Sequence, residues 1–147
     1  MRIKDVLAAK GRRVATLWSN RTLRDVVTLF DERNIASVVV TDPHGEPMGL
    51  VTDRAVIHAL ARHGAAALDM PVTRAMAQPF PTVAPDETVS LALKTMTVDR
   101  VRHLVVMEDD RMTGLVSIGD LVKIRLDDAD LERRVLSERA LGQMAIE

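Results

Sequence analysis

The stretch that decides the fold is Gly114–Val122, GLVSIGDLV, because an earlier part of the chain repeats it. Residues Gly49–Ile57, GLVTDRAVI, show a variant of the same pattern 65 residues earlier. In both copies a short apolar run, typical of a buried strand, leads into an apolar helical segment. Repetition of this kind indicates two structural units that are built alike.

The repetition extends upstream of both copies, where the offset is 66 residues. Residues Thr22–Phe30 match Thr88–Met96, with apolar side chains at i, i+3, i+4 and i+7 of each helix. This spacing predicts an amphipathic helix with one buried stripe. Residues Ala36–Val40 match Arg102–Val106, and these short runs predict buried strands.

One more strand, near Val14–Leu17 in the first copy and Thr82–Val83 in the second, completes each unit. We therefore expect an α/β (α+β) fold made of two β-α-β-β-α repeats. The predicted boundaries are 1–70 for the first repeat, with an N-terminal helix, and 71–147 for the second, with a C-terminal helix. Because the helices of each repeat leave one sheet face uncovered, the repeats should pack together as a pseudo-two-fold pair.

Two helical segments are predicted outside the repeated elements. Val72–Met76 is expected to form a short helix between the repeats. Beyond Val122 no glycine or proline occurs before Gly142, which predicts a long terminal helix to about Leu141.

The composition argues against several classes of function. The 147 residues include no cysteine, which removes disulfides and thiolate chemistry and fits a reducing compartment. A net charge of −1 and an aromatic content of 2% argue against nucleic-acid binding. No apolar run approaches the roughly 20 residues of a membrane span, so we expect a cytoplasmic protein without membrane contact. The four histidines lack metal-ligand spacing and no catalytic triad can be assigned, so we predict no metal and no enzymatic activity.

The duplicated order of elements and the two copies of the motif together resemble a tandem CBS (cystathionine-β-synthase) domain protein of the small, stand-alone bacterial type. The resemblance runs from roughly Ile3 to Ile124. It implies a disc-like pair of repeats with two clefts that bind adenosine-containing ligands: AMP as the first candidate, then ATP, NAD or S-adenosylmethionine. It also implies a homodimer that regulates a separate protein, which the sequence does not name.

The chemistry of Ser117–Asp120 supports two compatible interpretations. A hydroxyl at Ser117, where a strand enters a helix, can bond a phosphate oxygen beside the positive end of the helix dipole. The Asp120 carboxylate can accept both hydroxyls of a ribose, while Ile118 and Gly119 between them bring backbone close to the ligand. Alternatively, Ser117 and Asp120 form a capping box that holds only the start of the helix.

The first copy of the motif departs from the second at the carboxylate. Thr52 keeps the hydroxyl, but Ala55 stands where Asp120 stands in the second copy. We therefore expect two unequal pockets, of which the one with Ser117 and Asp120 is the better nucleotide site.

The resemblance also implies which residues line the opposite walls of the two pockets. For the Asp120 pocket, the residues expected around adenine are Val14, Ala15, Asn34, Ile35 and Ala36. For the Thr52 pocket, Pro81, Val101 and Arg102 are expected. Arg102 and His103 carry suitable chemistry for phosphate, although an exposed strand arginine and an interior histidine without ligand remain the alternatives. The basic run Lys10–Arg13 could meet phosphates at the mouth of the cleft, but it is interpreted as a solvated loop.

Two functions follow from these observations. The first is a sensor, in which an adenine nucleotide changes the packing of repeats or subunits and a partner protein reads the change. The alternative is a constitutive dimeric interaction module that binds no ligand.

Overall fold

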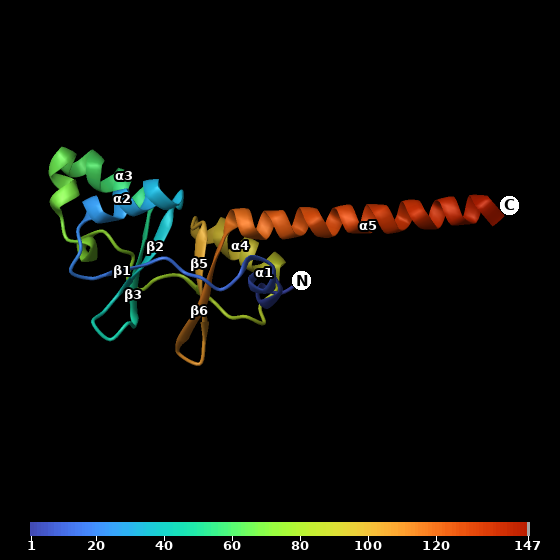
Figure 1. The fold of residues 1–147 in the computed structure, drawn as a ribbon, viewed down its shortest axis with the longest axis horizontal. Helices are drawn as coiled ribbons and strands as arrows, with labels where there is room; N and C mark the ends of the chain where they lie inside the picture. The colour runs from blue at the N-terminus through green and yellow to red at the C-terminus, as the bar shows by residue number, and fades with distance from the viewer. Residues whose placement is uncertain (147) are drawn as a thin grey trace.

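The computed structural model describes residues 1–146, with side chains through residue 142. Each repeat has the predicted β-α-β-β-α order (Figure 1). The first repeat contains β1 (Thr16–Trp18), α2 (Leu23–Arg33), β2 (Ser37–Thr41), β3 (Pro47–Thr52) and α3 (Asp53–His63). The second contains β4 (Thr82–Val83), α4 (Val89–Asp99), β5 (His103–Glu108), β6 (Arg111–Ser117) and α5 (Ile118–Ile146). The helix α1 (Ile3–Lys10) precedes both, and the 3-10 helices η1 (Gly64–Asp69) and η2 (Val72–Arg74) connect them.

The two sheets share one topology, which confirms the predicted duplication. In each, the first strand runs parallel to the second, and the second pairs with the third in an antiparallel hairpin. One detail differs from the prediction: β1 begins at Thr16 rather than near Val14. Val14 and Ala15 precede the strand, although the Ala15 carbonyl still accepts a hydrogen bond from the Val39 amide at 3.0 Å.

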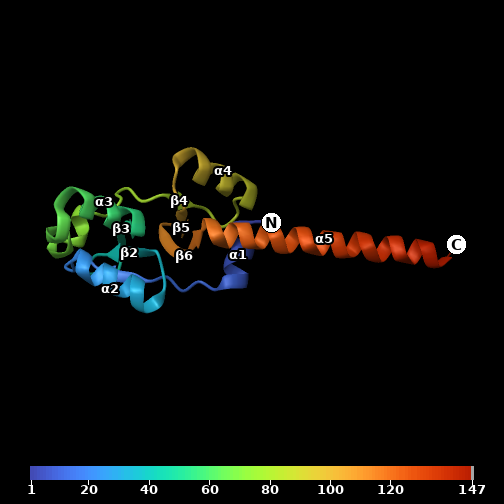
Figure 2. The same ribbon diagram turned by 90° about the horizontal axis from the view of Figure 1, so that it is seen from above.

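Alternation along the central strands builds three apolar layers. Successive side chains of a strand point to opposite faces of its sheet. In β2, Val38 and Val40 therefore pack beneath the helices of their own repeat, whereas Val39 faces the other sheet. In β5, Val105 likewise faces the other sheet, and it packs with Val39 in one apolar cluster. The inner faces of the two sheets thus pack together, and the helices cover the outer faces (Figures 1 and 2).

The repeats are also joined by an exchange of their leading segments. The helix α1 precedes the first repeat in sequence, but its Ile3 and Leu7 are buried in the core of the second. Conversely, Val72 of η2 precedes the second repeat and is buried in the core of the first. The hydrogen bonds match: the Val89 amide donates to the Met1 carbonyl, as the Leu23 amide donates to the Met70 carbonyl, both at 3.0 Å.

Two glycines make this exchange sterically feasible. A Cβ added to Gly114 would lie 2.6 Å from Cδ2 of Leu7, and one added to Gly49 would lie 2.5 Å from Sδ of Met76. Real Cβ atoms do not approach other heavy atoms this closely, so each leading segment lies against strand backbone that only glycine leaves open. The exchange was not predicted from the sequence, although Met1–Leu7 and Met70–Met76 share the spacing of their apolar residues.

The terminal helix α5 is longer than predicted, since it begins at Ile118 and runs to Ile146 without a break. Within α5, among the residues whose side chains are described, burial is confined to the first turns, at Leu121 and Ile124. The remainder extends away from the two repeats (Figures 1 and 2). Among the described residues, no helix is both long and apolar enough to cross a membrane.

Candidate functional site

A cavity of about 450 Å³ lies where the two repeats and their connection meet. The strand-to-helix junction of the first repeat contributes one side, and the segment between α4 and β5 contributes the other. The aliphatic part of the lining consists mainly of Leu50, Met76, Ala77, Pro81, Val101 and Ile118. The polar part consists of Thr52, Arg54, Arg100, Arg102 and His103. Its volume falls within the range of about 300–1,000 Å³ that is usual for small-molecule sites.

The start of α3 supplies a hydroxyl and the positive end of a helix dipole at this cavity. Thr52 is the N-cap, and its Oγ1 accepts a hydrogen bond from the amide of Ala55 at 3.4 Å. The positive end of the helix dipole favours an anion at such a position.

Three arginines line the cavity, and no carboxylate is among its lining residues. Arg102 lies at the entry to β5, and its Nη2 donates to Oδ1 of Asp53 at 3.1 Å. Both side chains of this pair are about half exposed, so their attraction is weak and a phosphate can compete with it. Within the part of the chain whose side chains are described, neither Arg54 nor Arg100 forms an ion pair.

His103 lies next to Arg102 and is partly buried. Burial, followed by the charge of Arg102, lowers the pKa of the His103 imidazole below its ordinary value. Asp53 and Asp120 act in the opposite direction but do not outweigh these effects. This lowered pKa favours the neutral imidazole, and an anion bound nearby favours the cation by raising the pKa.

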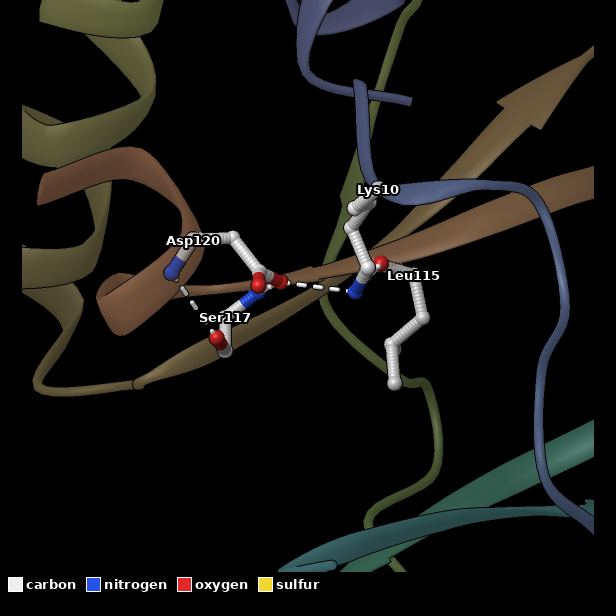
Figure 3. A network of polar contacts seen from close by, with 4 residues as sticks. All are labelled: Lys10, Leu115, Ser117 and Asp120. Carbon is white, nitrogen blue, oxygen red and sulfur yellow. Dashed lines mark hydrogen bonds and ion pairs between the residues drawn. The ribbon is translucent and has the colours of Figure 1, made fainter. Parts of the chain in front are cut away.

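In the second copy of the motif, the serine and the aspartate bond to each other. The Ser117 amide donates to Oδ2 of Asp120 at 2.8 Å, and the Asp120 amide donates to Oγ of Ser117 at 3.1 Å. These reciprocal bonds form the capping box that was one of the two interpretations. Lys10, at the end of α1, donates from Nζ to Oδ2 of Asp120 at 2.7 Å and to the Leu115 carbonyl at 2.9 Å (Figure 3).

The electrostatics of Asp120 reflect these partners. Burial alone would raise the pKa of the Asp120 carboxyl, but the hydrogen bond from Lys10 and that from the Ser117 amide hold this pKa below its ordinary value. The side chains of Lys10 and Asp120 are only 33% and 25% exposed, so the pair is partly shielded from water. The interpretation of Lys10 as part of a solvated loop is wrong, because its ammonium group is held by two partners that lie more than 100 residues away in sequence.

Asp120 faces a smaller hollow of about 150 Å³, which it shares with Lys10 and Lys123. The larger cavity is instead lined by six residues that were predicted for the site: Thr52, Pro81, Val101, Arg102, His103 and Ile118. Ser117 and Gly119 lie at the junction of β6 and α5 and are not among the lining residues of either cavity. The larger hollow is thus on the side of the motif copy that lacks the carboxylate.

The five residues expected around adenine at Asp120 line neither of these two cavities as the structure describes them. Val14 packs between the sheets, and Ala15 packs against the core of the first repeat. Asn34 ends α2 with a left-handed backbone, φ 51°. The Ile35 amide bonds the Phe30 carbonyl, and the Ala36 carbonyl accepts from the amide of Asp53. Their role around adenine stays a prediction.

Sequence reasoning missed Arg54 and Arg100 as cavity residues. A signal for Arg100 was available in the duplication, since it occupies the position of Asn34, which had been selected in the first copy. Both residues end their helices with positive φ, 51° at Asn34 and 55° at Arg100. For the described residues, no group of three or more metal-ligating side chains is found.

Comparison with known proteins identifies relatives for this arrangement. A family model described as "CBS domain" matches residues 3–62 and 72–127. The solved structure of the CBS-domain containing protein ATU1752 from Agrobacterium tumefaciens is 35% identical with a TM-score of 0.82, and the match covers 84% of this chain and 92% of that one. The CBS domain protein PAE2072 from Pyrobaculum aerophilum, complexed with AMP, is 26% identical with a TM-score of 0.71 over 82% of this chain and 89% of that one.

A curated relative is longer than the region it shares with this chain. The CBS domain-containing protein CBSX3, mitochondrial, from Arabidopsis thaliana is 32% identical over 130 residues, which is 82% of this chain. The match spans 63% of the length of the Arabidopsis protein.

Proposed function

The chain belongs to the CBS domain family, and on that premise we propose that it is a regulatory module that binds an adenosine-containing ligand between its two repeats. The observation that carries the proposal is the cavity of about 450 Å³, which combines an aliphatic lining with three arginines, a histidine and a helix start. A flat purine needs apolar surface on its faces, and a phosphate needs cationic donors and free amides.

The polar groups are divided between the repeats in a way that suits a nucleotide. Thr52 and Arg54 come from the first repeat, whereas Arg100, Arg102 and His103 come from the second. A ligand that touches both groups stabilises the packing in which they face each other, so binding is coupled to the arrangement of the repeats. We propose that a separate partner protein reads this arrangement.

AMP is the first ligand to test, because the Pyrobaculum relative is complexed with AMP. ATP, NAD and S-adenosylmethionine share its adenosine and follow as competitors. We place the site at Thr52 rather than at Asp120, because Lys10 already occupies the Asp120 carboxylate.

Isothermal titration of ligand-free protein with AMP, ATP, NAD and S-adenosylmethionine tests this proposal. In Arg102→Ala the affinity for AMP is expected to fall about tenfold or more, since a charge-assisted bond to phosphate is lost. Arg111→Ala is the matched control, because Arg111 is an exposed arginine of β6 outside the cavity. If folded wild-type protein binds none of these ligands, the proposal is wrong.

The alternative, a constitutive dimeric interaction module, is favoured by one feature of α5. Leu131 and Val135 are exposed apolar residues four positions apart, so they share one face of the part of α5 that extends from the repeats. Such apolar side chains are suited to a helix–helix interface with a second copy. This function predicts that self-association, measured by sedimentation equilibrium, is changed neither by Arg102→Ala nor by any added nucleotide.

A further inference from the structure

The two copies of the motif place different groups at one equivalent position. Thr52 and Ser117 each accept a hydrogen bond from the amide three residues later, at 3.4 Å from Ala55 and 3.1 Å from Asp120. Ala55 and Asp120 therefore project from the same point of the first helical turn. In the cavity of about 450 Å³ this point carries a methyl group, which cannot accept the hydroxyls of a ribose.

The residue before this point also differs in charge between the two copies. Arg54, the residue before Ala55, lines the same cavity, where the second repeat has Gly119 before Asp120. Arg54 is exposed and forms no ion pair with any side chain in the described part of the chain, so its guanidinium is available to an anion. The start of α3 adds the positive end of the helix dipole.

A carboxylate favours a ribose with free hydroxyls, and an arginine favours a ribose that carries a phosphate. A carboxylate accepts hydrogen bonds from a free diol and repels a phosphate on it, whereas an arginine binds that phosphate with two parallel hydrogen bonds. Dinucleotide-binding folds separate unphosphorylated from phosphorylated ribose by this same exchange. The α3 start, with Ala55 and Arg54, has the composition suited to the phosphorylated form.

We propose that this cavity prefers an adenine nucleotide that carries a phosphate on its 2′ or 3′ ribose hydroxyl in addition to its 5′-phosphate. The inference rests on the proposed function, since it places adenosine in this cavity. The aliphatic lining covers the base, Arg100, Arg102 and His103 of the second repeat hold the 5′-phosphate, and Arg54 holds the ribose phosphate. The cavity's three arginines match the charge of two separated phosphates.

The test is isothermal titration with four probes: AMP, ADP, adenosine 2′,5′-bisphosphate and adenosine 3′,5′-bisphosphate. ADP is the charge control, because its second phosphate extends the 5′ end rather than the ribose. One of the two bisphosphates is expected to bind about tenfold more tightly than both AMP and ADP. Which one does so identifies the ribose position.

Two variants locate the selectivity. Arg54→Gln is expected to remove the advantage of the bisphosphate over AMP and ADP, and Ala55→Asp is expected to reverse the preference in favour of AMP. Arg54 is exposed, so its replacement should not affect folding, which far-UV circular dichroism checks. If AMP binds and neither bisphosphate exceeds ADP, or if Arg54→Gln keeps the advantage, the inference is overturned and the proposed function stands. If none of the four probes binds, both fail.

Discussion

Replacing Gly49 by alanine tests the contact that joins the connection between the repeats to the first sheet. The added Cβ would lie 2.5, 2.7 and 2.9 Å from Sδ, Cγ and Cβ of Met76. Carbon atoms in contact are usually separated by about 3.5–4.0 Å, so the whole Met76 side chain, including its Cβ, must move by about 1 Å. Rotating the end of a flexible chain cannot relieve a clash that includes Cβ.

The backbone around Met76 resists this movement. The Ala77 amide donates to the Leu50 carbonyl at 2.8 Å, and the Leu50 amide donates back to the Ala77 carbonyl at 3.2 Å. The Met76 amide also bonds the Val72 carbonyl at 3.1 Å. Overpacking of this kind costs about 1–3 kcal/mol. For a chain of this length, that lowers Tm by about 2–10 °C.

Urea unfolding of four proteins measures the effect: wild type, Gly49→Ala, Met76→Ala and the double variant. The double variant is expected to recover about 1 kcal/mol or more relative to the sum of the single variants, because the clash disappears with the methionine side chain. Gly119→Ala is the control, since an added Cβ there has only Ser117 Oγ at 3.6 Å and should change stability by about 0.5 kcal/mol or less. An unchanged unfolding midpoint in Gly49→Ala, or additive losses in the double variant, would refute the reasoning.

The contact between Gly49 and Met76 also affects the proposed ligand site. Met76 and Leu50 both line the cavity of about 450 Å³, so displacing Met76 disturbs the apolar surface that is proposed to cover the base. Nucleotide affinity in Gly49→Ala is therefore expected to fall together with stability, whereas Gly119→Ala keeps both.

Two further predictions concern titratable groups. Burial and Arg102 lower the pKa of His103, and a bound phosphate raises it again, so affinity for AMP should increase from about pH 8 to about pH 6. Titrations in buffers of different ionisation enthalpy should show proton uptake that His103→Gln abolishes, and absence of uptake in the wild type contradicts the assignment. Because Lys10 and the Ser117 amide hold the pKa of Asp120 below its unfolded value, their stabilisation is present above the unfolded pKa and is lost as pH falls through the folded pKa. In urea unfolding, Asp120→Asn should lower the free energy of unfolding by about 1–2 kcal/mol at neutral pH and by less in acid. An equal loss at every pH excludes the charge of Asp120 as the cause.

Much of the fold could be predicted because the signals are local. The i, i+3, i+4, i+7 spacing in Thr22–Phe30 follows from the geometry of a helix. The alternation of Val38, Val39 and Val40 between the two faces of their sheet follows from the geometry of a strand. The start of β1 could not be placed to the residue, since Ala15 bonds to β2 without belonging to the strand. Of the site, Thr52, Arg102, His103 and Ile118 were selected in advance and do meet in one cavity.

The sequence by itself determined the duplication, the order of elements and the capping motif of each second helix, because each depends on residues close together in the chain. Only the tertiary structure decided that α1 packs on the second repeat, and that Lys10 meets Asp120 while the larger cavity lies beside Ala55. These features join residues as many as 110 positions apart. They depend on side-chain volumes and charges across the two sheets, which no local pattern records.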